Sequence, residues 1–294
     1  MKILDGFEEP KPLEKGVWKV NEATYRADSA LNFHTLADFK RDPKAFNDGF
    51  FAAREENDAM RFGTACHAAI LQGADVYRET VAAFTPPVNA ATGAPFGSTT
   101  KAYQEARAAF DVANAGKTII TADDAETIEK IRLEILFHPV APQILGGWGE
   151  SEIAIKGELI VDGRPVTVKA RLDRYGAAGL TDFKTTASIA DATGKDRFRY
   201  AVYDYKYLLQ VGFYHLILTD VCGAPFVPVY LLAAERNAPH RAAVYAATRQ
   251  VVEDARTVAK QWVRDYVEAL ETNYYPSPFD SVQIIDRYNL ERDL

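Results

Sequence analysis

The stretch GLTDFKTT, residues 179–186, decides the fold that we expect for this chain. Asp182 and Lys184 are two positions apart, so on a β-strand they share one face while Phe183 points to the other. A carboxylate beside an ammonium on one sheet face is suited to hold a metal and a water. Because Asp-x-Lys is a common pattern, a surface ion pair is the alternative for these two residues taken alone.

The segment before it, VTVKARLD at 166–173, reads as a neighbouring strand. The GAAG turn at 176–179 then predicts an antiparallel pair, which brings Asp173 near Asp182 and Lys184. One face is apolar and the other is polar or charged. The apolar face consists of Val166, Val168, Ala170 and Leu172, and the polar face of Thr167, Lys169, Arg171 and Asp173.

Length and composition indicate a globular protein. The 294 residues, 48% of them hydrophobic, suit one elaborated domain or two small ones with a sizeable core. Cys66 and Cys222 are too few for a disulfide framework, a four-cysteine zinc site or an iron–sulfur cluster. The N-terminus MKILDGFEEP is not a signal peptide, and no apolar run has the length of a membrane span. We therefore expect a cytoplasmic protein with no membrane partner.

The charge is unevenly distributed. The net charge of -7 argues against non-specific nucleic-acid binding by bulk charge. Residues 164–206 nevertheless contain nine Lys or Arg against five Asp or Glu, and two of these acids are Asp173 and Asp182. A local basic site on an acidic body is compatible with DNA held in a confined channel, and equally with a solvated pair of strands.

Periodicity predicts helices on either side of the strands. We expect an N-terminal arm at 1–28 and a single domain at 29–294, whose central mixed sheet has helices before and after it. Residues 85–100, rich in Pro, Gly, Ser and Thr, predict a long loop. The expected helices are 35–39, 43–51, 58–72, 101–114, 122–137, 200–221 and 248–271, and the expected strands are 150–161, 165–173, 179–185, 226–234 and 241–247.

Several further residues are candidates for the site. His67 lies within the helix expected at 58–72, where a hydrogen-bonded histidine without a function is the alternative. Glu152 alternates with isoleucines on its strand and could be a simple exposed acid. Lys206, Gln210 and Tyr214 follow one another at intervals of four, on one face of the helix expected at 200–221. Three further residues of that helix, Tyr203, Tyr205 and Tyr207, could stack on bases, but core and rim positions are the alternative.

Four segments in this order resemble the exonuclease VIII (RecE-like) branch of the PD-(D/E)xK nuclease superfamily. The core segments are ARLDRY and TDFKTTASI, in which Leu172 stands where the PD-(D/E)xK pattern has a loosely kept proline. The resemblance covers residues 29–250 and implies an α/β restriction-endonuclease-like core. Its segments are RFGTACHAAIL (61–71), GESEIAI (149–155), ARLDRY to TDFKTTASI (170–189) and AVYDYKYLLQVGFYH (201–215).

The resemblance implies the role of each residue. Asp173 and Asp182 would bind Mg²⁺ or Mn²⁺ with the Phe183 backbone carbonyl, and His67 would complete or flank that shell. Glu152 would support the shell or bind a second metal. Lys184 would orient the attacking water and stabilise charge on the phosphorane. Supporting or DNA-binding positions are Gln210, Tyr214, Lys206, Arg171 and Lys169.

The activity that this implies is a metal-dependent, ATP-independent 5′→3′ exonuclease on double-stranded DNA ends. It would leave 3′ single strands for a single-strand annealing protein, act as a homo-oligomeric ring, and be encoded by a phage or prophage in a bacterial host. One alternative is a PD-(D/E)xK endonuclease or single-strand nuclease. Another, of a different class, is a non-catalytic DNA-binding subunit.

Overall fold

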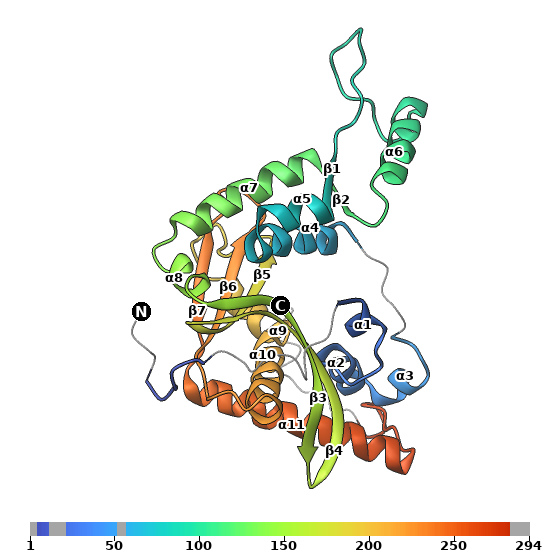
Figure 1. Cartoon of the computed structure of the whole chain (residues 1–294). Coiled ribbons are helices and arrows are strands. Elements are labelled where there is room, and N and C mark those ends of the chain that lie inside the picture. The colour runs from blue at the N-terminus through green and yellow to red at the C-terminus, as the bar shows by residue number, and fades with distance from the viewer. Residues whose placement is uncertain (1–4, 12–21, 52–56, 283–294) are drawn as a thin grey trace.

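A five-stranded mixed sheet forms the centre of the structure. In the computed structural model the described residues are 5–11, 22–51 and 57–282 (Figure 1). The strand order is β3-β4-β5-β6-β7, and only the β5–β6 pair is parallel. This confirms the predicted α/β core with a mixed sheet. The strands are β3 (Gly149–Val161), β4 (Arg164–Gly176), β5 (Gly179–Thr186), β6 (Val229–Glu235) and β7 (Ala242–Ala246).

The sheet is buried on both faces, and β6 shows why. Its sequence VYLLAAE is apolar at almost every position, as expected for a strand with helices on both sides. Alternate residues enter two different cores. Leu231 packs with the helices of one face, and Leu232 with those of the other. The helices therefore cover the sheet as two outer layers.

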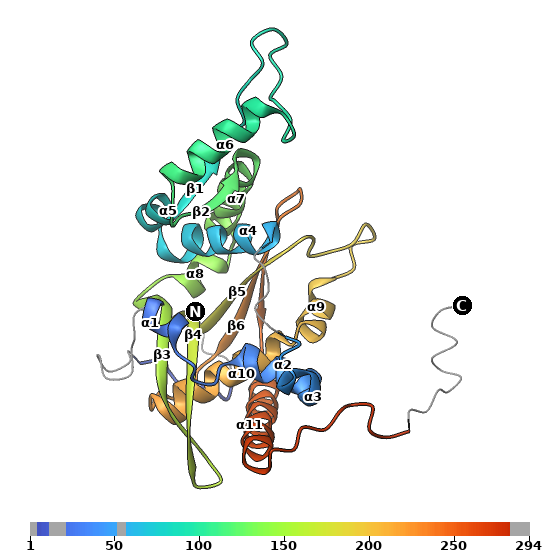
Figure 2. The same ribbon diagram turned by 90° about the vertical axis from the view of Figure 1, so that its right-hand side faces the viewer.

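The two layers come from different parts of the chain (Figures 1 and 2). The helix α4 and a following π-helical turn, with α7 and α8, cover one face, while α2, α10 and α11 cover the other. Within the described residues, no helix is both long and apolar enough to cross a membrane. These elements are α2 (Phe33–Arg41), α4 (Asp58–His67), η1 (Ala68–Gln72), α7 (Ala122–Phe137), α8 (Ala141–Leu145), α10 (Tyr207–Leu216), η2 (Ile217–Val221) and α11 (Arg249–Thr272).

Two glycines allow backbones to approach closely at positions that matter for the site. Gly179 begins β5 at φ 122°, and a Cβ there would lie 2.2 Å from the carbonyl oxygen of Pro228. A Cβ on Gly212 of α10 would lie 2.7 Å from the backbone of Ala255 in α11. Any side chain at either position would force the backbones apart. Glycine at 179 therefore sets how β5 enters the sheet.

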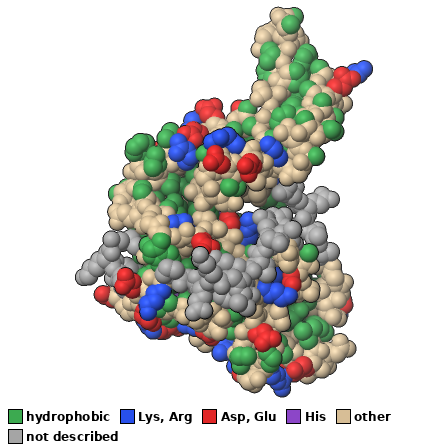
Figure 3. All heavy atoms as spheres, in the orientation of Figure 1, with side chains coloured by type: hydrophobic (Ala, Val, Ile, Leu, Met, Phe, Trp, Pro, Cys, Tyr) green, Lys and Arg blue, Asp and Glu red, His purple; other side chains and the backbone are tan. Residues whose placement is uncertain are grey.

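Residues 81–121, which follow the short helix α5, form a projection that the sequence only partly predicted. Two four-residue parallel strands, absent from our expectation, carry it at its base. The segment 85–100, expected as a loop, folds back on itself with a bridge between Val88 and Pro95 and contains no charged residue. It stands clear of the body (Figure 3). The elements are α5 (Ala74–Thr80), β1 (Val81–Phe84), α6 (Lys101–Ala113) and β2 (Thr118–Thr121).

The expected single helix at 200–221 is wrong. The chain forms α9 (Phe198–Asp204) and then α10, and Lys206 between them adopts the left-handed conformation at φ 58°. A residue with a Cβ rarely adopts this conformation, so the sequence carries no signal for the break. The other expected helices and the five expected strands are confirmed to within a few residues, except that 43–51 is helical only over α3 (Pro43–Asn47).

Described parts of the predicted arm lie against the body. The short helix α1 (Glu22–Ala27) is held by Lys169, whose Nζ donates to the carbonyl oxygens of Tyr25 and Asp28 at 2.7 and 2.5 Å. Nearer the N-terminus, the Phe7 ring stacks on Phe226 at 5.5 Å between centroids. Residues 1–4 and 12–21 of the arm lie outside the described residues. The domain boundary after residue 28 stays a prediction.

Candidate active site

The site lies where β4 and β5 separate. Their ladder runs from Gly176 and Gly179 to the pair Arg174 and Thr181, and it ends there. One residue further, the carboxylate of Asp173 accepts a hydrogen bond from the backbone N–H of Phe183 at 2.7 Å. A side chain thus takes the place of a ladder hydrogen bond. The predicted antiparallel pair is confirmed, and it sets Asp173 beside the Asp-x-Lys strand.

Asp182 and Lys184 form a buried ion pair. The Lys184 Nζ lies 2.8 Å from Asp182 Oδ2, and the side chain of Asp182 is only 1% exposed. Burial raises the pKa of Asp182 to about 6, although the Lys184 charge opposes this. Burial alone would lower the pKa of Lys184, but the carboxylates of Asp182 and Asp173 outweigh it and hold that pKa above its ordinary value. Lys184 is therefore a cation at neutral pH.

Helix α10 supports this pair from one side of the sheet. The Lys184 ammonium lies 5.0 Å from the ring centroid of Tyr207, a cation–π distance. Tyr214 is buried, and its hydroxyl accepts a hydrogen bond from Gln210 Nε2 at 2.8 Å. Burial and the charges of Asp182 and Asp173 hold the pKa of Tyr214 well above its ordinary value. The Tyr214 hydroxyl is thus a neutral group close to both carboxylates.

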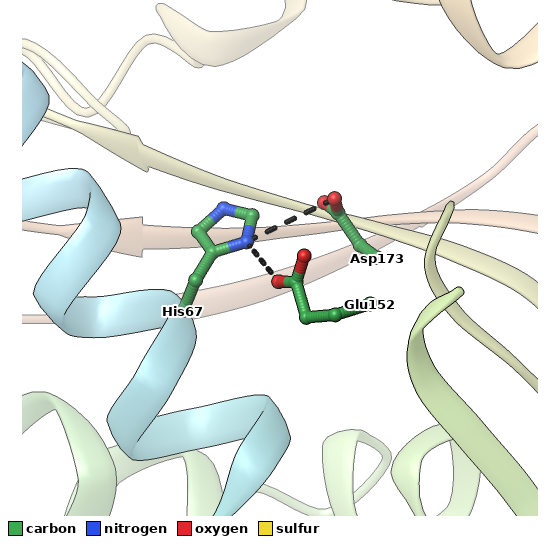
Figure 4. A group of neighbouring side chains, drawn as sticks. All are labelled: His67, Glu152 and Asp173. Atoms are coloured by element: carbon green, nitrogen blue, oxygen red, sulfur yellow. Dashed lines mark hydrogen bonds and ion pairs between the residues drawn. The ribbon is translucent and has the colours of Figure 1, made fainter. Parts of the chain in front are cut away.

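On the other side, His67, Glu152 and Asp173 converge (Figure 4). The His67 Nδ1 lies 2.9 Å from Glu152 Oε1 and 3.8 Å from Asp173 Oδ1. His67 is the last residue of α4, and its ring lies 5.2 Å from that of Phe183. The imidazole therefore reaches the carboxylates from the helix layer, across β5.

Glu152 is held in an unusual backbone conformation. Its φ is 52°, and it interrupts the β3–β4 ladder at the position opposite Asp173. Such a conformation costs about 1–3 kcal/mol for a residue with a Cβ and is typical of functional sites. Its second carboxylate oxygen lies 2.8 Å from Arg171 Nε. Glu152 is thus fixed between a guanidinium and an imidazole.

The charges around His67 favour its protonated form. Burial alone would lower the pKa of His67, but the carboxylates of Asp173 and Glu152 outweigh it and raise that pKa above its ordinary value. A positive group is therefore favoured at this point between two acids. A bound cation would take over that role, since a metal ligand must be a neutral imidazole.

The residues fit a divalent metal ion. One ligand atom from each of His67, Glu152 and Asp173 can be chosen so that all lie within 4.8 Å of one another. Nearby, the buried Oδ1 of Asp182 has no hydrogen-bond partner among the residues that the structure describes. Carboxylate oxygens suit Mg²⁺, and an imidazole shifts the preference toward Mn²⁺. This donor set can bind either ion.

Glu152 and Asp182 lie differently from the ligand set that we expected. Glu152, expected to support the shell or to bind a second metal, lies within the ligand group itself. Asp182 lies outside that group and pairs with Lys184, and metal binding by Asp182 stays a prediction. The backbone N–H of Phe183 is taken by Asp173, and metal binding by its carbonyl stays a prediction.

The remaining predicted residues divide into two groups. Arg171 pairs with Glu152, and Gln210 donates a hydrogen bond to Tyr214; their role in supporting the site or binding DNA stays a prediction. Lys169 is 5% exposed, and its ammonium donates hydrogen bonds to the carbonyl oxygens of Tyr25 and Asp28 around α1, so it holds that helix; a contact of Lys169 with DNA stays a prediction. The Lys206 ammonium lies 5.3 Å from the Trp262 ring centroid in α11, and its contact with DNA stays a prediction.

Two residues of the site were not predicted. Tyr207 was considered only as one of three tyrosines on a helix, because its contact with Lys184 depends on the break at Lys206. Tyr25 of α1 lies near Arg171, which lowers its pKa, but burial has the larger effect and raises it to about 12. A residue so far from the core strands in sequence gives no local signal of this contact.

Comparisons with known proteins agree with this fold. A family described as "PDDEXK-like domain of unknown function (DUF3799)" matches residues 32–287. A solved structure from Eubacterium rectale, described as a "Putative exonuclease", is similar with a TM-score of 0.58 and 14% identity. The match covers 95% of this chain and all of that one. The structure of SSO0001 is matched over 52% of this chain and 70% of that chain at 15% identity, with a TM-score of 0.25, too low to indicate a shared fold. No curated protein matches the chain.

Proposed function

The chain belongs to the PDDEXK-like family DUF3799, and we propose that it is a metal-dependent nuclease that hydrolyses phosphodiester bonds in DNA. The observation that carries this proposal is that two groups of side chains lie next to each other where β4 and β5 separate. One is the ligand group of His67, Glu152 and Asp173, and the other is the buried pair of Asp182 and Lys184. A surface ion pair would explain neither the burial nor the histidine.

Each residue has a role that follows from its surroundings. His67, Glu152 and Asp173 would hold Mg²⁺ or Mn²⁺. When bound, such an ion supplies polarisation of a phosphate oxygen and makes water a better nucleophile near neutral pH. Arg171 fixes Glu152 in its orientation. Asp182 supplies a further oxygen whose lone pairs no described residue satisfies by a hydrogen bond.

Lys184 acts as a donor and a charge, because its raised pKa leaves no lone pair on the amine at neutral pH. It orients the attacking water through a hydrogen bond and stabilises the negative charge that develops on the phosphoryl oxygens. Asp182 and the Tyr207 ring keep the ammonium in place. Preorganised charge of this kind is commonly the largest contribution to catalysis.

The finer proposal is a 5′→3′ exonuclease that acts on linear double-stranded DNA without ATP. Two likenesses support it: the ordered motifs of the exonuclease VIII group, and the solved neighbour from Eubacterium rectale that carries an exonuclease description. The exposed 3′ single strand would serve a partner annealing protein in recombination, in a bacterial cell that carries a phage or prophage.

Linear duplex DNA labelled separately at its 5′ and 3′ ends tests this, beside a closed circle, with Mg²⁺ or Mn²⁺ and no ATP. We expect early release of the 5′ label and an intact circle. Cutting of the circle would instead indicate an endonuclease. If neither label is released with either metal, nuclease activity is contradicted and a DNA-binding subunit is favoured.

Light scattering on the same preparation tests the proposed homo-oligomeric ring. A protein that is monomeric at all concentrations would exclude the ring.

A further inference from the structure

Helix α9 and the turn after it carry three exposed tyrosines next to the candidate active site. Tyr200, Tyr203 and Tyr205 are 50%, 72% and 67% exposed, so they are neither core nor half-buried rim. Phe198 and Val202 hold the same helix to the body. Large aromatic rings this exposed are suited to contact a ligand rather than to stabilise the fold.

The break at Lys206 creates a stack of aromatic rings. In a continuous helix, residues 205 and 207 would point about 200° apart and could not meet. With Lys206 in the left-handed conformation, the rings of Tyr205 and Tyr207 stack at 5.7 Å between centroids and an interplanar angle of 27°. A conformation that costs free energy is thus used to align two rings.

This stack leads from the surface to the proposed catalytic lysine. The Lys184 ammonium lies 5.0 Å from the ring centroid of Tyr207, the Tyr207 ring stacks on Tyr205, and Tyr205 is exposed. The distance from the Lys184 ammonium to the Tyr207 ring and the distance from that ring to the Tyr205 ring together span no more than about three nucleotides, at about 3.4 Å per nucleotide of a stacked strand. A base on Tyr205 would therefore lie within a few nucleotides of a phosphate at Lys184.

Cations accompany the aromatic rings. Lys195 lies 4.9 Å from the ring centroid of Tyr200, and the side chains of Arg197 and Arg199 are 57% and 75% exposed in surface ion pairs with Asp191 and Asp196. Figure 2 shows the loop after β5 running outward and returning into α9 at the edge of the body. Exposed ion pairs are weak and exchange readily for phosphates.

Resting on the proposed function, we infer that Tyr205, the exposed end of the Tyr205–Tyr207 stack, is a stacking platform for an unpaired base of the DNA strand whose phosphate enters the active site. Alternating aromatic rings and cations are the means by which proteins bind single strands without reading their sequence. The enzyme would then hold an unpaired end of the strand beside the site, and its affinity for single strands would depend on these rings.

Fluorescence titration tests this with a short single-stranded oligonucleotide containing 2-aminopurine, with Ca²⁺ in place of Mg²⁺. Stacking quenches the probe in the wild-type protein. Tyr205→Ala should raise the dissociation constant about tenfold and relieve the quenching, because one stacked base is lost. Tyr205→Phe should keep the wild-type dissociation constant and the quenching, because the aromatic ring remains. Tyr274→Ala is the matched control, since Tyr274 is 64% exposed but lies beyond the end of α11.

The outcomes separate this inference from the proposed function, because metal-dependent hydrolysis of linear duplex is measured on the same wild-type protein. Weaker binding by Tyr205→Ala alone supports the platform. Equal binding and quenching by wild type and Tyr205→Ala overturns the platform and leaves the nuclease proposal standing if hydrolysis occurs. Absence of binding and quenching by the wild type also overturns the platform, and absence of hydrolysis then removes the nuclease proposal as well.

Discussion

Replacing Glu152 by glutamine should weaken metal binding while leaving the site in shape. The two side chains have the same size, and both must adopt the same strained backbone at φ 52°. The change removes a charge that faces His67 Nδ1 at 2.9 Å and Arg171 Nε at 2.8 Å. Loss of a partner next to a metal lowers affinity about 10–100-fold, and we expect at least this for a direct ligand.

The size of the effect can be worked out for thermal unfolding with Mn²⁺ at about 100 times the wild-type dissociation constant. The wild type then gains about 2.7 kcal/mol. A Glu152→Gln variant with affinity lowered 10–100-fold gains only about 0.4–1.4 kcal/mol at the same concentration. At about 2 °C per kcal/mol for a chain of this size, Mn²⁺ should raise Tm by about 5 °C in the wild type and by about 1–3 °C in the variant.

The control is Glu158→Gln, which removes the same charge from an exposed position on the same strand and should keep the full rise. The comparison uses the difference in Tm measured with and without Mn²⁺, so any effect of the substitution on the stability of the metal-free protein cancels. An equal rise in wild type and Glu152→Gln would refute the ligand group built from His67, Glu152 and Asp173.

Three further predictions follow from single contacts. Lys184→Met should lower the rate of DNA hydrolysis about 10²–10³-fold or more while Mn²⁺ still raises Tm; a rate near that of the wild type would exclude Lys184 from catalysis. In the metal-free protein, burial raises the pKa of Asp182 to about 6 from its ordinary value of 3.8, so its contribution to stability is complete below pH 3.8 and lost as the pH rises through 6. Denaturant unfolding should show a loss on the order of 3 kcal/mol over this range that Asp182→Asn does not show, and parallel curves would contradict it. Affinity for Mn²⁺, measured by calorimetry, should fall as the pH drops below the raised pKa of His67, up to about tenfold per pH unit, and pH-independent affinity would rule out the imidazole as a ligand.

The strands were predictable because their signal is local. In β4 the apolar and polar residues alternate strictly, and a short glycine-bounded turn leads into β5. That pattern fixes register, and register alone places Asp173 beside Asp182 and Lys184. These three site residues could therefore be found from the sequence before any likeness was considered.

Other parts of the site depend on contacts between distant segments. His67 and Glu152 are 85 residues apart, and only the resemblance to a nuclease family linked them. The left-handed Lys206 breaks a segment whose composition is helical, which concealed the role of Tyr207. The four-residue strands β1 and β2 pair across α6, and such short runs have too few residues to show a period.

Hydrolysis of end-labelled linear duplex DNA by the wild type and by Asp182→Asn is the decisive test of a metal-dependent nuclease site at Asp182 and Lys184. It should be done with Mg²⁺, with Mn²⁺ and with a chelator. We expect hydrolysis by the wild type with either metal and none with the chelator. For Asp182→Asn, whose side chain keeps its size but loses its charge, we expect a rate at least about 10²–10³-fold lower than that of the wild type. Hydrolysis by Asp182→Asn at the wild-type rate would contradict this expectation.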